Sequence, residues 1–437
     1  MTGGARVLQA DRSQLSWDLI DLEGLLAADH RARVVWGFVE SLDLRRFYEA
    51  IGSREGEAGR PAADPKVLLA LWLYATVEGV GSARELDRLV GRDVAYRWLA
   101  GGVPVNYHGL SDFRVAWARE LDRLLVESVT ALVSQGLVSL DEVAVDGTKI
   151  RAPASGGSFT RGGRLARIEQ EVTERVARLK AELESDPAAA SRRRQAAQAR
   201  AAREVADKVA KVRAALDRLR REKAAREKTH PREEQHKREP SVSLSDPEAR
   251  RMRFADGAVR AGYNLQTVAV PGCGLILAVA ATDRRNDTGL AGPMVRAVAR
   301  RYGRMPQRVL LDQGYATQAD VTALATHPRG PVAVYAPPPA EKPEAELTPA
   351  EAAKRRRKRA AEPPAVQAWR ARMQSEDGQT VSRRRSLIER LHAHYKNRAL
   401  TRITVRGRRK AWAVALWHAL ANNMMLAHRL RSAAQPA

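Results

Sequence analysis

The sequence predicts a mixed α/β protein in which an all-helical N-terminal region precedes a domain of alternating strands and helices. Two short apolar runs, each followed by an aspartate, indicate buried strands in the second region. Helical periodicity dominates residues 1–140 and returns over residues 164–240. A sheet domain interrupted by a helical segment accounts for both patterns.

The N-terminal region, residues 1–140, contains several short helical patterns. Pro65 opens an apolar helix that Gly79 ends, and Ser82 stands where it can cap the next helix. A third helix is expected over residues 111–134. Arginines on these helices suit a DNA-binding domain. A helical bundle that only packs on the rest of the chain fits them equally well.

The sheet domain begins over residues 141–163 with a strand, and the Asp146-Gly147 pair predicts a turn that breaks it. Residues 164–240 then carry two apolar stripes at helical spacing. The stripes are Ile168, Val172, Val176, Leu179 and Leu183, then Val205, Val209, Val212, Leu216 and Leu219. Asp186 can cap the second helix at Pro187. We expect an inserted basic helical hairpin, which is a solvated charged pair, a DNA-gripping arm or a dimerisation arm.

Strands and helices alternate again from residue 241. Residues 263–270 and 275–281 are predicted strands, and the intervening Pro-Gly-Cys-Gly turn makes them a hairpin. A helix over 290–300, a strand over 308–312, a helix capped by Thr317 and a strand over 331–335 are expected to follow.

The last part of the chain divides into a polar segment and two helices. Residues 337–382 are rich in Pro, Glu and Arg and include the basic run Lys354 to Arg359, which predicts a basic mobile insertion. Helices are expected over 384–398 and 410–428. The catalytic domain would therefore comprise residues 141–163 and 241–437.

The predicted order of strand, hairpin, helix, strand, helix, strand and helix is that of the ribonuclease H-like fold. It places Asp146 on the first strand, Asp312 at the end of the fourth and Glu389 on a late helix. Carboxylates on rigid strands and on a facing helix provide the hard oxygen ligands that two Mg²⁺ ions require. Arg385 and Lys396 share the helix face of Glu389, although an ordinary surface ion-pair ladder has the same spacing.

The charge of the chain indicates a polyanionic partner. The formal net charge is +24, and such an excess is typical of nucleic-acid-binding proteins. A basic membrane-surface protein is the competing interpretation, but the basic residues are spread over the whole length. The single cysteine, Cys273, excludes an intrachain disulfide and a multi-cysteine metal site. Because no apolar signal segment or bilayer-length run is present, we expect a soluble, intracellular protein with no membrane partner.

Several motifs resemble those of DDE insertion-sequence transposases. Arg385, Glu389 and Lys396 match the R-x3-E-x6-K part of the family signature Y-x2-R-x3-E-x6-K. Similar stretches are V-D-G-T-K at 145–149, D-P-E-A-R at 246–250, G-Y-N-L-Q at 262–266, N-D-T-G at 286–289, D-Q-G-Y at 312–315 and R-G-R-R-K at 406–410. Residues 65–114 resemble the N-terminal domain of the family. Two positions depart from the pattern, because Ser382 replaces the tyrosine and His392 stands where an aromatic residue is expected.

The resemblance implies a metal-dependent site. Asp146, Asp312 and Glu389 would be the catalytic residues and would bind two Mg²⁺ ions, with Mn²⁺ as the alternative ion. The implied DNA contacts are Arg385, Lys396, Lys149, Arg406 and Lys410, and the residues that would orient ligands or DNA are Asn264, Asn286 and Asp287.

The resemblance also implies partners and a function. The partners would be double-stranded DNA, as element ends and as target, and a second copy of the chain when two ends are synapsed. The place of action would be the bacterial cytoplasm, at the nucleoid. A ribonuclease H-like nuclease or resolvase without strand transfer, a non-catalytic DNA-binding or architectural protein and a catalytically decayed copy remain alternatives.

Overall fold

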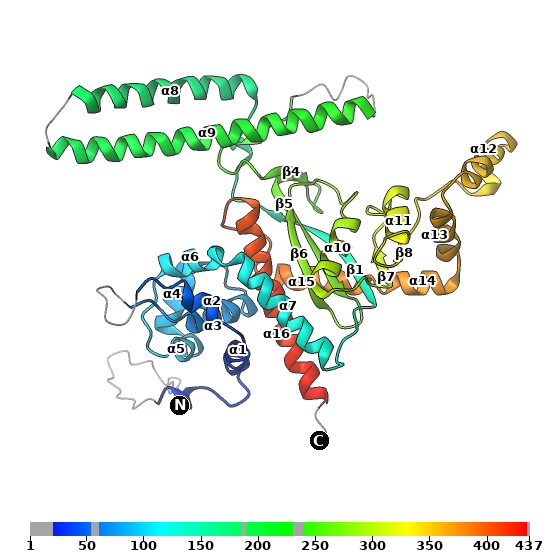
Figure 1. Cartoon of the computed structure of the whole chain (residues 1–437), viewed down its shortest axis with the longest axis horizontal. Helices are drawn as coiled ribbons and strands as arrows, with labels where there is room; N and C mark the ends of the chain where they lie inside the picture. Colours follow the sequence, from blue (N-terminus) through cyan, green and yellow to red (C-terminus); the bar gives the residue numbers. More distant parts are fainter. Residues whose placement is uncertain (1–20, 54–60, 186–188, 230–238, 435–437) are drawn as a thin grey trace, which may run out of the picture.

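The computed structural model describes residues 21–53, 61–185, 189–229 and 239–434. The predicted helix cap at Asp186 and Pro187 lies outside these ranges. The N-terminal helices lie on one side of the long C-terminal helix, the sheet lies on its other side, and a pair of long helices extends above both (Figure 1). Within the described ranges, none of the helices combines the length and apolar character that crossing a bilayer demands.

The N-terminal region is helical, as predicted. Its helices are α1 Arg31–Glu40, α2 Arg45–Glu49, α3 Pro65–Val77, α4 Ala83–Arg92, α5 Val94–Ala100, α6 Tyr107–Ala116 and α7 Ala118–Ser134, after a 3₁₀ turn at Glu23–Leu25. The predicted cap is confirmed, because the Ser82 hydroxyl accepts a hydrogen bond from the Glu85 backbone N–H at 3.4 Å. The single helix predicted over 111–134 is wrong. Trp117 leaves the helical backbone conformation and packs its ring 4.6 Å from that of Phe47, which separates α6 from α7.

A mixed six-stranded sheet forms the centre of the second region. Its strands are β1 Glu142–Arg151, β4 Arg250–Arg253, β5 Val259–Val270, β6 Leu275–Thr282, β7 Arg308–Leu311 and β8 Ala333–Tyr335. The order is β4-β5-β1-β7-β8, and β6 also pairs with β5. β5 is antiparallel to β1 and to β6, whereas β1, β7 and β8 are mutually parallel. The predicted hairpin of two strands is present as β5 and β6. The mixed sheet fits the predicted ribonuclease H-like fold.

The turn predicted at Asp146-Gly147 is wrong. Both residues lie inside β1, opposite Thr267 and Gln266 of β5, and the strand continues to Arg151. The twelve-residue β5 pairs with β1 from Ala144 to Arg151 and overrides the local turn preference of Asp-Gly. The glycine at 147 instead lets the Gln266 side chain lie close to the β1 backbone, since a Cβ atom there would be 2.4 Å from the Gln266 side-chain nitrogen.

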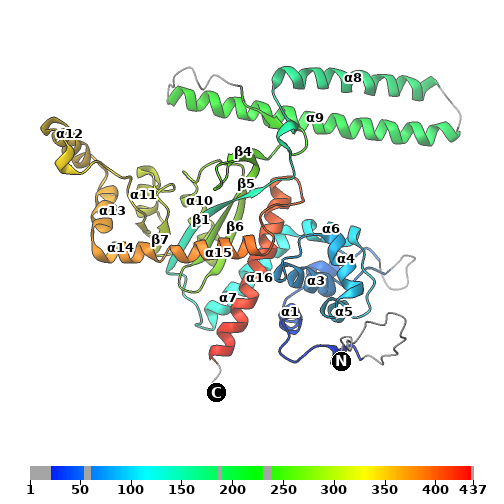
Figure 2. The same ribbon diagram turned by 180° about the vertical axis from the view of Figure 1, so that it is seen from behind.

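Helices cover both faces of the sheet (Figure 2). α15 (Ser386–Asn397) and α16 (Arg408–Ala434) share an apolar core with Ala144, Ile150 and Leu265. α10 (Ala291–Tyr302) and α11 (Gln318–Ala325) cover the other face, on Val143, Val145 and Val268. Alternate residues of β1 therefore belong to different cores, and Asp146 has the orientation of Ala144.

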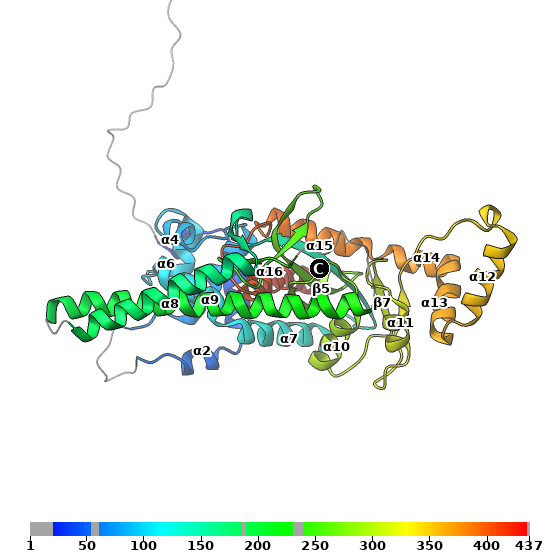
Figure 3. The ribbon, with the colours of Figure 1, turned by 90° about the horizontal axis from the view of Figure 1, so that it is seen from above.

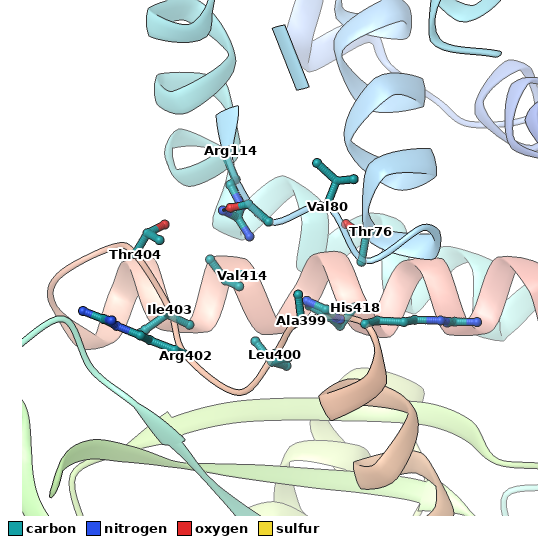
Figure 4. A pocket seen from close by; sticks show the side chains of 12 residues that line it. Thr76, Val80, Arg114, Ala399, Leu400, Arg402, Ile403, Thr404, Val414 and His418 are labelled. Carbon is teal, nitrogen blue, oxygen red and sulfur yellow. Dashed lines mark hydrogen bonds between the residues drawn. The ribbon is translucent and has the colours of Figure 1, made fainter. Parts of the chain in front are cut away.

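α16 also joins the sheet domain to the N-terminal helices. The rings of Trp72 on α3 and Trp417 on α16 lie 6.4 Å apart, and the Trp417 indole donates to the Arg114 carbonyl at 2.9 Å. A cavity of about 20 Å³ remains at this junction, lined by Arg114 of α6 and His418 of α16 among others (Figure 4). Arg114 is buried and stacks 4.6 Å above the Trp72 ring. The N-terminal helices are thus packed against the sheet domain.

Two long helices, α8 Gly162–Ser185 and α9 Ala189–Thr229, pack along each other and extend over the molecule (Figure 3). The pair buries the predicted residues Val209, Val212, Leu216 and Leu219 with Leu165. Val205 is 47% exposed, contrary to prediction, because the buried seam of α9 passes through Ala202 instead. The side chains of Leu179 and Leu183 are outside the described part of the chain.

A charge cluster fixes α9 to the sheet. Asp283, after β6, accepts hydrogen bonds from Arg218 of α9 at 2.8 Å and from Arg250 of β4 at 3.1 Å. Arg250 also pairs with Glu222 at 2.7 Å. A short ladder of β2 (Phe159–Thr160) with β3 (Val242–Ser243), after a 3₁₀ turn at Gly156–Ser158, closes the base of the helical pair.

Residues 337–382, whose composition predicted a mobile insertion, are mostly helical. A 3₁₀ turn at Glu344–Glu346 precedes α12 Pro349–Ala360, α13 Pro364–Gln374 and α14 Glu376–Arg383. Two prolines that suggested a loop occupy the first helical position, where the missing N–H costs nothing. Trp369 of α13 is 1% exposed and donates to the Ala336 carbonyl at 3.0 Å, which anchors the segment beside β8.

Candidate active site

The three acidic residues singled out in the sequence surround one arginine. Asp146 lies within β1, Asp312 follows β7 directly, and Glu389 lies in the first turn of α15. The Arg385 guanidinium is 3.7 Å from Asp146 Oδ2, 3.9 Å from Asp312 Oδ1 and 2.9 Å from Glu389 Oε1. Because β1 and β7 are parallel neighbours that pair up to Val145 and Leu311, their next residues lie side by side.

This carboxylate cluster, defined as Asp146, Asp312 and Glu389, has an excess of negative charge and is partly open. The side chains of Asp312 and Glu389 are 55% and 58% exposed, and that of Asp146 is 15% exposed. In the part of the chain that the structure describes, no three acidic, histidine or cysteine side chains are arranged to hold one metal ion. In the carboxylate cluster, the Arg385 guanidinium lies between the three acids. The donor set itself, three carboxylates with one compensating cation, has the hard-oxygen chemistry that Mg²⁺ or Mn²⁺ takes.

Beneath Asp146 lies a buried group of polar side chains. His392 Nδ1 is 3.5 Å from Asp146 Oδ2, and Thr267 stands opposite Asp146 on β5. Within the described residues, His392 Nε2 is buried without a hydrogen-bond partner. The buried Tyr395 hydroxyl lies close to Thr267, and burial raises the pKa of Tyr395. An unsatisfied buried polar atom is costly, and the ring that carries it lies directly beside Asp146.

The other sheet face carries a saturated polar network below Gly147. The amides of Asn264 and Gln266 donate to Asp287 Oδ1 at 2.7 and 2.8 Å, and the Tyr315 hydroxyl donates to Gln266 Oε1 at 2.5 Å. Asn264 and Asp287 were predicted to orient ligands or DNA. They contact each other on the sheet face opposite the carboxylate cluster and tie the loop after β6 to β5. Their role toward ligands or DNA stays a prediction.

Asn286, the third of these predicted residues, is exposed beside that network. Gln266 and Tyr315 were not singled out as site residues. The motifs G-Y-N-L-Q and D-Q-G-Y, which contain them, were the available signal.

A second buried hub joins three of the motifs. The Tyr263 hydroxyl donates to Asp246 Oδ1 at 2.7 Å, and the Gly407 N–H donates to the same oxygen at 3.3 Å. Burial raises the pKa of Asp246 despite the hydrogen bonds. Gly407 has φ of +90°, which favours glycine at this position. The hub fixes the start of α16 against β5.

The predicted DNA-contacting residues divide into two groups. Lys149 is half-buried and donates to the Arg253 carbonyl at 2.8 Å, so its ammonium is held by β4. Lys396 on α15 and Arg406 and Lys410 near the start of α16 are exposed. Ser382 is half-buried at the end of α14.

Comparison with known families covers both regions of the chain. A family model described as "Transposase DDE domain" matches residues 139–424, well over half of the sequence. The chain belongs to the DDE transposase family. A second model, described as "Transposase domain (DUF772)", matches residues 20–116 and so covers the N-terminal helices through α6. No curated protein and no solved structure matches the chain.

Membership makes this chain a transposase of the insertion-sequence type, with DNA as its substrate. The matched DDE domain contains all three residues of the carboxylate cluster. DDE domains of transposases use divalent metal ions, which agrees with the donor set of this cluster.

Proposed function

We propose that this transposase binds the ends of an insertion sequence and catalyses metal-dependent DNA cleavage followed by strand transfer. The observation that carries the proposal is the convergence of Asp146, Asp312 and Glu389 on one guanidinium in an open cluster. Three acids compensated by a single arginine attract divalent cations, and the overall charge of +24 attracts DNA.

The chain's own residues would act as follows. Asp146 and Asp312, on rigid parallel strands, and Glu389, on a facing helix, are the proposed ligands of two Mg²⁺ ions, with Mn²⁺ as a substitute. Bound divalent ions activate the attacking oxygen and stabilise the leaving oxygen of an in-line displacement at phosphorus. Arg385 would exchange its carboxylate partners for a DNA phosphate, which its planar fork can bind through two hydrogen bonds.

His392 and the exposed cations would support these residues. The His392 ring would orient Asp146 from below through its Nδ1 atom. Lys396, Arg406 and Lys410 are exposed, which supports a role as phosphate contacts. Lys149 would hold DNA only after release from the Arg253 carbonyl. Ser382 removes one side chain from the DNA contact and leaves the carboxylates in place, so we propose an active enzyme rather than a decayed copy.

The domain organisation follows the same proposal. Residues 1–140 form a DNA-binding domain, residues 141–163 and 241–437 form a ribonuclease H-like catalytic domain, and residues 164–240 are an inserted basic helical hairpin. The helical segment 337–382 adds a basic surface through α12. Two copies of the chain would assemble when two element ends are synapsed.

A reaction with labelled DNA tests the proposal. Duplexes that carry the inverted repeats flanking the reading frame are incubated with Mg²⁺, the protein and a target plasmid. We expect cleavage at the repeat and a joined product. Asp146→Asn should lower cleavage at least about a thousandfold while DNA binding persists. Asp377→Asn, an exposed acid on α14, is the matched control and should act normally.

Other outcomes of this reaction contradict the proposal. Cleavage with no joined product would indicate a nuclease or resolvase. Binding with no cleavage in any metal would indicate a decayed or architectural protein. Equal activity of Asp146→Asn and wild type would remove the carboxylate cluster from the mechanism.

A further inference from the structure

Positive charge is concentrated in a groove at the end of β1. A groove of about 760 Å³ opens there between the 152–159 loop, the β4–β5 hairpin and the segment before α16. Four arginines line it, namely Arg151, Arg251, Arg260 and Arg402, and none of its described lining residues is acidic. The groove is distinct from the carboxylate cluster and shares no residue with it.

Two of these arginines are held side by side by the backbone. Arg151 and Arg402 form an isolated parallel bridge, in which the Arg151 N–H donates to the Thr401 carbonyl at 3.0 Å. The Ile403 N–H donates back to the Arg151 carbonyl at 2.9 Å. Both arginines are exposed. Their spacing is therefore set by hydrogen bonds that already exist without a ligand.

The other two arginines differ in how far protein atoms compensate them. Arg251 stacks 4.7 Å over the Phe159 ring and donates to the Gly156 carbonyl at 2.9 Å, so its position is fixed and its charge remains. Arg260 pairs with Asp256 at 2.6 Å and is neutralised. Among the residues that the structure describes, no acid pairs with the guanidinium groups of Arg151, Arg251 and Arg402, and such groups suit the bidentate recognition of phosphate oxygens.

The groove lies at the end of the strand that carries Asp146. Arg151 is the last residue of β1 and follows Asp146 by five residues, which spans about 17 Å at the rise of a β-strand. The two side chains leave opposite faces of the sheet, so DNA bound at the cluster reaches the groove only by passing the end of β1. The axial rise of a DNA duplex is about 3.4 Å per base pair, so this distance corresponds to about five base pairs.

We infer that this groove binds the sugar–phosphate backbone of the DNA about five nucleotides from the reacting phosphate. The position of the reacting phosphate rests on the proposed function. The charge and the fixed spacing of the arginine pair are independent of the proposed function. Arg151 and Arg402 supply the paired guanidinium groups, and Arg251 supplies the third.

Binding without metal tests the groove separately from catalysis. The affinity of the Arg151→Gln/Arg402→Gln double variant for an end duplex is measured over a range of salt concentrations. Loss of two phosphate contacts should reduce the slope of log K against log[salt] by about 1.8. Arg300→Gln, an exposed arginine on α10, is the matched control and should keep the wild-type slope. The Arg151→Lys/Arg402→Lys variant keeps both charges and should restore the slope, even if the glutamine variant is less stable.

Duplexes with single methylphosphonate substitutions locate the contact. For wild type, a neutral linkage within about three to seven nucleotides of the cut should weaken binding, and the double glutamine variant should be insensitive to it. A wild-type salt slope in a folded double variant would overturn the inference. If the neutral linkages weaken binding by the double glutamine variant as much as by wild type, the inference is overturned as well. Absence of cleavage in all proteins would contradict only the proposed function, because the salt slopes are measured without metal.

Discussion

Two arginine–carboxylate clusters of this transposase differ in charge balance. In the carboxylate cluster, Asp146, Asp312 and Glu389 share the single guanidinium of Arg385. At the base of the helical pair, three arginines meet three acids, and the members of this docking cluster are Arg218, Arg250, Arg408, Asp283, Glu222 and Glu248. The balanced cluster holds α9, β4 and α16 together, whereas the unbalanced one has charge left to bind cations.

Distances and burial agree with this difference. Asp283 is 9% exposed, and two arginines donate to it at 2.8 and 3.1 Å. Burial alone would raise the pKa of Asp283, but Arg250, Arg218 and Arg408 outweigh it and hold the pKa below its usual range. Arg385 is 3.7 and 3.9 Å from the two aspartates of the carboxylate cluster, which are long distances for ion pairs. The central acid of the docking cluster is therefore buried with short hydrogen bonds, whereas the two aspartates of the carboxylate cluster lie farther from their arginine.

The largest expected difference is in the response to metal. Mg²⁺ at a hundred times its dissociation constant should stabilise wild type by about 2.7 kcal/mol. Asp146→Asn should lose this gain. Without metal, the same variant should be as stable as wild type or more so, because one of three repelling charges is gone. Thermal unfolding with and without Mg²⁺ measures both effects, with Asp377→Asn as control. A full Mg²⁺ response in Asp146→Asn would show that the ion binds elsewhere.

Loss of Asp283 from the docking cluster should destabilise the fold, in contrast to loss of Asp146 from the carboxylate cluster. Asp283→Asn leaves Arg218 and Arg250 without their shared partner, and should lower the free energy of unfolding by about 2 kcal/mol. Its Mg²⁺ response should remain that of wild type. Chemical denaturation measures the loss. A stability equal to wild type would mean that the docking cluster contributes nothing to the fold.

Replacement of Arg385 tests how the two clusters differ in their cations. Arg385→Gln removes the one arginine that the described residues place among the three acids, so stability without metal should fall by about 1 kcal/mol. Affinity for Mg²⁺ or Mn²⁺ should rise several-fold, because the ion no longer competes with a guanidinium. Calorimetric titration with Mn²⁺ measures the affinity. Weaker metal binding by this variant would make Arg385 a support for the carboxylates rather than their competitor.

The smallest effect is expected in acid. The pKa of Asp283 is lowered in the folded chain, so its contribution is complete above the ordinary aspartate pKa of about 4. That contribution should be lost as the pH falls from about 4 through the folded pKa. Asp283→Asn should lose less stability than wild type over this interval. Equal losses in the two proteins would contradict the assigned role of Asp283.

Much of the fold could be predicted because its signals are local. The Ser82 and Thr317 caps, the β5–β6 hairpin and the apolar run before Asp312 each depend on a few adjacent residues. The errors arose where distant contacts override local preference. Pairing with β5 keeps Asp146-Gly147 in a strand, and burial of Trp369 orders a segment whose composition resembles a loop.

The candidate site was easier to predict in its acids than in its surroundings. The order of strands and helices predicted that Asp146, Asp312 and Glu389 lie near one another, and each of them lies within 4 Å of Arg385. Their role as metal ligands stays a prediction. The position of Arg385 among all three acids depends on the angle at which α15 crosses the sheet, which no spacing encodes. The partners of Asn264 on the opposite face depend equally on the loop after β6.

The three carboxylates should bind divalent metal once the Arg385 guanidinium has moved to a DNA phosphate. Anomalous scattering from Mn²⁺, in crystals of the protein bound to an end duplex, measures this directly. We expect Mn²⁺ between Asp146, Asp312 and Glu389, with the Arg385 guanidinium on a phosphate. A different result would contradict metal binding by the three carboxylates. In that result the carboxylates still surround Arg385 and hold no Mn²⁺, at a Mn²⁺ concentration that supports cleavage.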